Sequence, residues 1–131
     1  MASQQARVRV ILILAFMMSV LIHGVLVTIL PQSAGPSPAG VSANAHSVAY
    51  TIAGAALMTS LFWTITKLSA ATTPARFLSD LILALALAEA ASISGLILAI
   101  IGQKPADFWP LGIAALLVQG LFILPRALKR G

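Results

Sequence analysis

The chain has 131 residues, of which 60% are hydrophobic and only 8% are charged. Soluble domains carry about a quarter charged residues, so this composition excludes an ordinary soluble fold and indicates a membrane protein. The net charge of +5 comes from basic residues at the ends of apolar runs, a pattern typical of membrane topology and not of nucleic-acid binding. The sequence contains no cysteine, which excludes disulfides, thiolate metal sites and cysteine nucleophiles.

Four apolar segments follow one another along the chain, at about residues 8–30, 47–68, 77–101 and 108–124. Each is close to the ~20 residues that a helix needs to cross the hydrocarbon layer. Pro31, Pro36 and Pro38 interrupt the helical pattern between the first two segments, which predicts a loop there. The sequence therefore predicts a single all-α domain over residues 1–131, built as a bundle of four transmembrane helices.

The first apolar segment has two interpretations. Arg7 and Arg9 precede it, and the polar stretch after it contains Ala43-Asn44-Ala45, a small-x-small sequence of the kind that signal peptidase cuts. However, its apolar run exceeds the about 7–15 residues of an ordinary signal peptide, and the candidate cleavage site lies well downstream. We therefore expect a retained helix, with a cleaved signal as the alternative.

The distribution of charge predicts the orientation. Four crossings place seven basic residues on one side of the membrane, namely Arg7, Arg9, Lys67, Arg76, Arg126, Lys129 and Arg130. Only Lys104 falls on the other side, where Asp107 offsets it. Because cytoplasmic loops carry the excess of lysine and arginine, both termini are expected in the cytoplasm, with the chain in a bacterial-type plasma (inner) membrane.

Glu89 stands near the middle of the third apolar segment, LILALALAEAASISGLILAII. A charged side chain at the bilayer centre costs roughly 2.5–3.5 kcal/mol on insertion scales, so a role is expected for it. Ser92, one helical turn further on, is placed to offer its hydroxyl to the carboxyl. Two interpretations follow: a reversible proton-binding site formed by Glu89 and Ser92, or a neutral glutamate that holds two helices together through a hydrogen bond.

Small residues recur beside Glu89 at spacings of three and four. They are Ala84, Ala88, Ala91 and Gly95. Such a stripe lets helices approach closely in lipid, so this face is expected to pack against partner helices, with Glu89 at its edge.

Other polar residues within the segments are interpreted as structural. His23 is expected to be a packed polar residue and His46 an interfacial one, because their depths do not match as a bis-histidine haem would require. Gln119 could form a hydrogen bond across helices, including to Glu89, but by sequence alone it lies too far toward the cytoplasmic end. No catalytic or metal-ligand motif is present, so no enzyme activity, cofactor or metal is expected.

The third segment resembles a known family. Its run Ala86-Leu-Ala-Glu89-Ala, followed six residues after the acid by Gly95-Leu96, is similar to the carboxylate helix of subunit c, the proteolipid rotor subunit of rotary ATP synthases. The hairpin over residues 47–102 resembles the family more loosely, and its second segment has Ala53-Gly54-Ala55-Ala56 where the family has alternating glycines. The resemblance implies that Glu89 is a proton-carrying carboxylate.

Two functions therefore remain open from the sequence. One is a subunit-c-like, proteolipid-like membrane protein that binds or translocates protons through Glu89. The other is a non-catalytic structural or accessory membrane protein in which Glu89 is a helix-packing hydrogen bond. The expected partners are the lipid bilayer and either further copies of the chain or the subunits of a larger membrane complex.

Overall fold

The computed structural model describes residues 2–29, 43–102 and 105–129. Within these residues the chain is helical and contains no strand. The elements are α1 (Ala2–Thr28), α2 (Ala43–Trp63), η1 (Thr64–Leu68), α3 (Pro74–Gly102), η2 (Pro105–Asp107), α4 (Trp109–Leu117), η3 (Val118–Ile123) and α5 (Leu124–Lys129). The π-helical segments η1 and η3 continue α2 and α4 directly, so that α4, η3 and α5 form one long helical rod.

Four helical stretches of the described chain are long and apolar enough to cross a membrane, which confirms the expected all-α architecture. They are Gln4–Thr28, His46–Leu68, Pro74–Ile101 and Trp109–Lys129. The first helix begins several residues before its apolar run, and the last extends past Arg126, because arginine and lysine are good helix formers. The predicted loop at Pro31, Pro36 and Pro38 lies outside the described residues, whereas the candidate cleavage sequence at Ala43 forms the start of α2.

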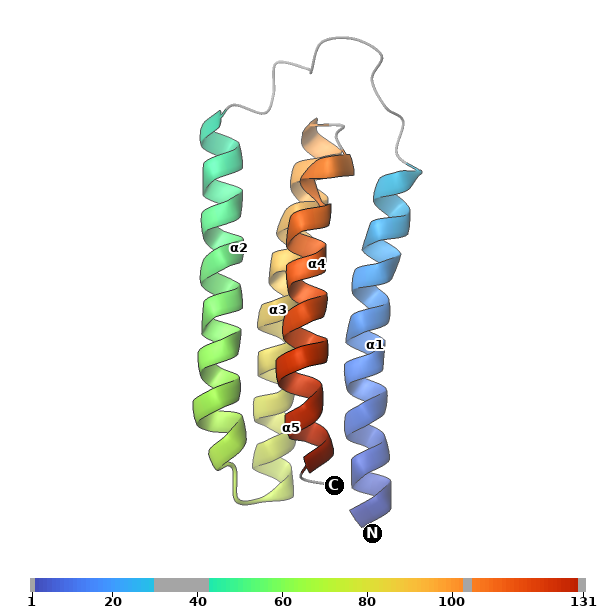
Figure 1. Ribbon diagram of the computed structural model, residues 1–131, viewed down its shortest axis with the longest axis vertical. Helices are drawn as coiled ribbons and strands as arrows, with labels where there is room; N and C mark the ends of the chain where they lie inside the picture. The colour runs from blue at the N-terminus through green and yellow to red at the C-terminus, as the bar shows by residue number, and fades with distance from the viewer. Residues whose placement is uncertain (1, 30–42, 103–104, 130–131) are drawn as a thin grey trace.

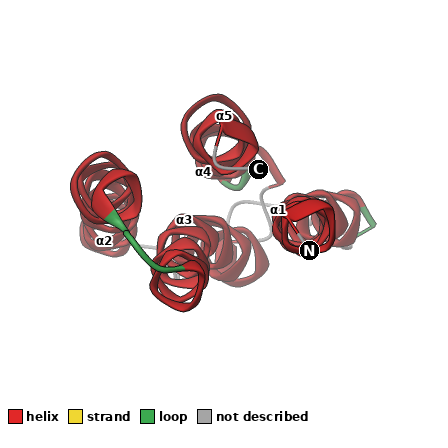
Figure 2. Cartoon of the chain, turned by 90° about the horizontal axis from the view of Figure 1, so that it is seen from below, coloured by secondary structure: helices red, strands yellow, loops and turns green. Residues whose placement is uncertain are grey.

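The helices alternate in direction, so that α1 and α3 run parallel to each other (Figure 1). α1 begins and α5 ends at the same end of the bundle as the α2–α3 turn; we call this the lower end and the opposite one the upper end (Figure 1). Seen along the bundle, α1 and α2 lie on opposite sides of the α3–α4 pair (Figure 2). α3 is the central helix: 50% of its most apolar stretch is buried, against 22% for α1 and 17% for α2.

Small residues allow α3 to take this central place. Ala84, Ala88, Ala91 and Gly95 are all buried. At the level of Ala84, the Ser60 hydroxyl of α2 donates a 2.7 Å hydrogen bond to the Ala84 carbonyl. At Gly95 the contact is with α4, since a Cβ built on this glycine would lie 3.1 Å from the Leu111 Cβ. α3 thus meets α2 and α4 with almost no side chain between the backbones, the way helices associate in lipid.

Of the three apolar clusters inside the bundle, one joins Ala53, Ala91 and Leu111, and the other two lie one toward each end. The lower cluster includes Ile13, Leu81, Leu85, Val118 and Ile123. The upper cluster consists of Val20, Val27, Ala99, Phe108 and Ala115. Buried side chains near the middle of α1 and α3 therefore lie between two apolar layers, away from both ends of the bundle.

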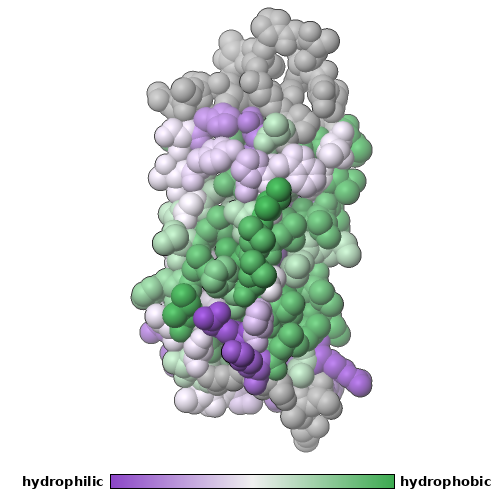
Figure 3. Space-filling model, viewed as in Figure 1, coloured by the Kyte–Doolittle hydropathy of each residue, from purple (hydrophilic) through white to green (hydrophobic). Residues whose placement is uncertain are grey.

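The outside of the bundle is also apolar. Large aliphatic side chains such as Ile11, Leu14 and Val25 of α1 are about half exposed or more. Figure 3 shows apolar residues across the middle of one face and polar residues toward both of its ends. An apolar belt between two polar ends is the surface expected of a protein that spans a bilayer with a hydrocarbon core about 30 Å thick.

The close α3–α4 contact generates a prediction for Gly95→Leu. A leucine there has to displace Leu111 and the Phe108 carbonyl, each within 3.3 Å of the Cβ position, so we expect a loss of about 1–3 kcal/mol or a failure to assemble. The matched control is Gly54→Leu in α2, where nothing lies within 4 Å of the Cβ position. Thermal unfolding in detergent measures both, and equal tolerance of the two changes would contradict the close packing of α3 on α4.

Candidate functional site

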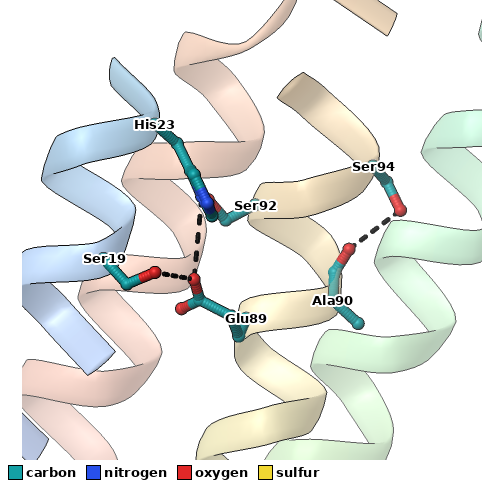
Figure 4. A network of polar contacts seen from close by, with 6 residues as sticks. All are labelled: Ser19, His23, Glu89, Ala90, Ser92 and Ser94. Carbon is teal, nitrogen blue, oxygen red and sulfur yellow. Dashed lines mark hydrogen bonds and ion pairs between the residues drawn. The ribbon is translucent and has the colours of Figure 1, made fainter. Parts of the chain in front are cut away.

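Four polar side chains meet between α1 and α3, halfway along the bundle (Figure 4). Ser19 and His23 come from α1, and Glu89 and Ser92 come from α3. Residues three or four apart share one face of a helix, so each helix presents its two polar side chains as a pair. Because the two helices run parallel, the pairs line up in the same order along the bundle. We call these four residues the polar cluster.

The polar cluster is held together by short contacts. The Ser19 hydroxyl donates a 2.6 Å hydrogen bond to Oε1 of Glu89. His23 Nδ1 lies 2.9 Å from the Ser92 hydroxyl, in a hydrogen bond whose donor depends on the tautomer of the ring. The same Nδ1 atom lies 3.6 Å from Oε1 of Glu89, which is an ion-pair distance when the imidazole is protonated.

The cluster is largely closed off from the surroundings of the bundle. Glu89 is 8% exposed and Ser92 is fully buried, while the His23 side chain is 16% exposed. The second carboxyl oxygen, Oε2, is buried and has no hydrogen-bond partner among the described residues. The Glu89 carboxyl therefore has to form its hydrogen bonds with other side chains of the bundle.

The contacts of Ser92 and His23 differ from those expected from the sequence. Ser92 bonds to His23, and the hydroxyl that reaches Glu89 comes from Ser19, a residue that the sequence analysis did not consider. His23 is not merely a packed polar residue, because it places a basic group 3.6 Å from the Glu89 carboxyl. The reason is geometric: a carboxyl at the edge of the α3 packing face points toward α1, beyond the reach of Ser92 on its own helix.

The signal for this grouping was present in the sequence. Ser19 and His23 are spaced by four in an otherwise apolar helix, and Glu89 and Ser92 are spaced by three in another. The predicted topology already made these two helices parallel. Depth measured from the cytoplasmic ends would have placed the two pairs at one level.

The cluster can hold a proton in more than one arrangement. With Glu89 protonated and His23 neutral, the Ser92 hydroxyl can donate to Nδ1, and no net charge is buried. With the proton on His23, the imidazolium and the carboxylate form a close pair in a medium of low polarity, where an isolated charge would be strongly disfavoured. Moving one proton between Glu89 and His23 thus changes the charges of the site without changing its net charge.

A second histidine–carboxylate pair closes the upper end of the bundle. His46 Nε2 of α2 lies 3.1 Å from Oδ1 of Asp107, and the His46 ring stacks on Tyr50 at 5.4 Å. Tyr50 in turn donates a 3.4 Å hydrogen bond to the Asp107 carbonyl. These contacts join the start of α2 to the α3–α4 connection, and the exposed position of His46 agrees with an interfacial residue.

The two acidic residues nearer the ends have basic side chains beside them. Asp80 of α3 lies 4.0 Å from Arg76 one turn earlier, and Asp107 pairs with His46. Across the described residues, no group of three or more histidine or acidic side chains is placed to hold a metal ion. Glu89 differs from Asp80 and Asp107 in its position, because it lies between the lower and upper apolar clusters and not near an end of the bundle.

The Ser19–Glu89 hydrogen bond generates a prediction. Ser19→Ala leaves the Glu89 carboxyl with one fewer donor in a buried site, so we expect the free energy of unfolding to fall by about 1–3 kcal/mol. Ser94→Ala is the matched control, since the Ser94 hydroxyl bonds only to the Ala90 carbonyl of its own helix (Figure 4). Chemical or thermal unfolding in detergent compares the two, and equal losses would show that the inter-helix bond contributes nothing special.

Comparisons of this chain with protein-family models, with curated proteins and with solved structures find no match. A function for the chain has therefore to be inferred from the chemistry of its own buried side chains.

Proposed function

We propose that this chain is a small multi-pass membrane protein that binds a proton reversibly at Glu89 and exchanges or translocates it. The observation that carries the proposal is the contact of Glu89 Oε1 with Ser19 at 2.6 Å and with His23 at 3.6 Å, at mid-membrane depth. Ionisable residues inside membrane spans are rare and commonly mark proton relays or ion pathways. A carboxyl beside an imidazole is such a pair, because each group can take the proton that the other releases.

The surroundings of the polar cluster suit an occluded proton site. The lower and upper apolar clusters separate it from both ends of the bundle, so a proton enters or leaves only when helices shift or water enters. α1 carries Ser19 and His23 of the polar cluster, and its membrane span is only 22% buried, so a shift of α1 would open the site. Exchange would thus be gated by the packing of α1 against α3.

A structural role for the same residues is the second candidate, favoured by the Ser19–Glu89 hydrogen bond. This bond links α1 to α3 across the interior, where small-residue packing alone provides little specificity. In this role the chain is a non-catalytic structural or accessory membrane protein, and Glu89 stays protonated throughout.

The resemblance of α3 to subunit c of rotary ATP synthases supports the first candidate from another direction. By that resemblance, the chain would work beside further copies of itself or within a larger membrane complex, with Glu89 as the proton carrier. Neither candidate includes an enzymatic step or a cofactor.

We further propose that both termini face the cytoplasm and that the membrane is the plasma (inner) membrane. Arg7 and Arg9 of α1, Arg76 at the α2–α3 turn, and Arg126 and Lys129 of α5 all belong to segments at the lower end. Cytoplasmic loops and tails carry the excess of basic residues, which assigns the lower end to the cytoplasm.

The orientation is tested with reporter fusions. A reporter in the α2–α3 turn near Thr72 or after Lys129 is expected to be active in the cytoplasm, and one inserted at Ser37 is expected to be exported. The turn and the end of α5 lie at one end of the bundle, so their reporters must agree. An exported reporter after Lys129 would reverse the proposed orientation.

The proton role is tested with Glu89→Gln and Glu89→Ala. Dicyclohexylcarbodiimide attacks protonated carboxyls in apolar surroundings, so we expect it to label Glu89, and faster at lower pH. Intact-mass measurement should show the label lost in both variants and kept in Asp80→Asn, the matched control for a buried carboxyl near the lower end. Proton uptake by vesicles that contain the purified protein should be lost in Glu89→Gln, while its thermal unfolding stays close to that of the wild type.

The two candidate functions give opposite results for this pair of variants. Under the structural role, Glu89→Gln is nearly silent in every measurement, because the amide can still accept from Ser19, whereas Glu89→Ala leaves a cavity and unfolds more easily. Proton uptake by the wild type that is no greater than in protein-free vesicles would exclude the proton role.

A further inference from the structure

Gln119 is a buried polar residue of the membrane interior that does not belong to the polar cluster. Its side chain is fully buried in η3, and neither its amide nitrogen nor its amide oxygen has a hydrogen-bond partner among the described residues. A buried amide without a hydrogen-bond partner lowers the stability of the fold, so a partner is expected for the Gln119 side chain. π-helical turns such as η3 occur frequently at functional sites.

The packing of α3 on α4 sets the depth of Gln119. Gly95 of α3 and Leu111 of α4 touch and are therefore level with each other. Glu89 lies six residues below Gly95, and Gln119 lies eight residues below Leu111. At a rise of about 1.5 Å per residue, these offsets are roughly 9 and 12 Å, so the two Cα atoms differ in depth by only about 3 Å.

The direction of the side chains reduces this difference. Helical side chains lean toward the N-terminus of their own helix, which is downward for Glu89 in α3 and upward for Gln119 beyond α4. By this estimate Gln119 lies close to the depth of Glu89, whereas the sequence analysis placed it further toward the cytoplasmic end. That placement came from counting residues within the span, whereas the Gly95–Leu111 contact fixes the offset between α3 and α4.

Gln119 also lies on the face of its helix that meets α1 and α3. Ala115, one turn earlier, packs in the upper cluster with Val20 of α1 and Ala99 of α3. Gly120, the next residue, faces α1, where a Cβ would lie 3.5 Å from the Met17 side chain. η3 thus packs against α1 and α3, the two helices that carry the polar cluster, as well as against α2.

Glu89 offers the complementary group, since its Oε2 is also buried without a partner among the described residues. We propose that one bound water molecule bridges the Gln119 amide to Oε2 of Glu89, making Gln119 a positioning residue of the proton site. A buried water needs two to four polar partners, and these two side chains provide three polar atoms. An amide also suits a carboxyl that changes charge, because it can donate through its nitrogen or accept through its oxygen.

This inference deepens the proposed function, but its test does not depend on proton translocation. If Gln119 has no partner, Gln119→Met removes a buried unpaired amide and raises the Tm in detergent. If the water bridge exists, the same change leaves the water and Oε2 without the amide, and the Tm falls. In a Glu89→Met background, where the other partner is also apolar, Gln119→Met should no longer lower the Tm.

The wild type, Gln119→Met, Glu89→Met and the double variant form a double-mutant cycle, and each outcome of it supports or overturns the bridge. A lower Tm in the wild-type background that disappears with Glu89→Met supports the bridge. An unchanged or higher Tm in the wild-type background overturns it, as does an equal fall in both backgrounds. If Gln119→Met alone gives no folded protein, the double variant decides, because recovery of folding supports the bridge and continued failure overturns it.

A second measurement, the pH dependence of carbodiimide labelling at Glu89, distinguishes a positioning role of Gln119 from a role in helix packing alone. His23 of α1 is the titratable side chain that the described residues place at the Glu89 carboxyl, and η3 contributes the uncharged Gln119. Loss of the amide-held water removes a donor to the ionised carboxylate, so carbodiimide labelling of Glu89 should persist to higher pH in Gln119→Met. Ser60→Ala, which removes a different buried hydroxyl, should leave that pH profile unchanged. Absence of labelling in the wild type would count against proton binding at Glu89 and leave the Tm result standing.

Discussion

A carboxyl group buried in the middle of an apolar helix must find its hydrogen-bond partners within the protein, and this requirement links α1 to α3. The apolar side chains above and below Glu89 offer no donor, so the Ser19 hydroxyl at 2.6 Å takes that role. His23 follows one turn later and completes the contact through Ser92. The position of α1 in the bundle is therefore specified by polar contacts as well as by apolar packing.

The central place of α3 has a different physical origin. Ala84, Ala88, Ala91 and Gly95 carry little or no side chain, so α2 and α4 can approach the α3 backbone closely. Ser60 uses this proximity to bond to the Ala84 carbonyl. With α2 and α4 on the small-residue face, the carboxyl of Glu89 is left to face α1, the helix that can meet it with a hydroxyl and an imidazole.

The two histidine–carboxylate pairs have different environments. His46 and Asp107 lie at the upper end, where the His46 side chain is 39% exposed and the aqueous phase can stabilise either charge. His23 and Glu89 lie between apolar layers, where the location of a proton changes the free energy of the whole site. The same pair of residue types thus forms an interfacial contact in one place and a candidate proton site in the other.

The sequence alone determined the helical class, the four membrane-length helices and the unusual position of Glu89. These features depend on local quantities, namely the length of apolar runs and the free energy of placing one charge in hydrocarbon. The π-helical turns at Thr64–Leu68 and Val118–Ile123 were not predictable in this way, because the length of an apolar run does not distinguish a π-helical turn from an α-helical one.

Only the tertiary structure decided which side chains surround Glu89. Ser92 was the natural partner along one helix, yet the contacts formed are to Ser19 and His23, about seventy positions away. Gln119 was judged by its distance from the end of its own span, whereas counting from the Gly95–Leu111 contact gives its Cα atom and that of Glu89 a difference in depth of only about 3 Å. Which side chains become partners depends on the rotation and relative height of the packed helices. Rotation and height are set by contacts between segments far apart in the sequence, and a local sequence pattern does not reveal such contacts.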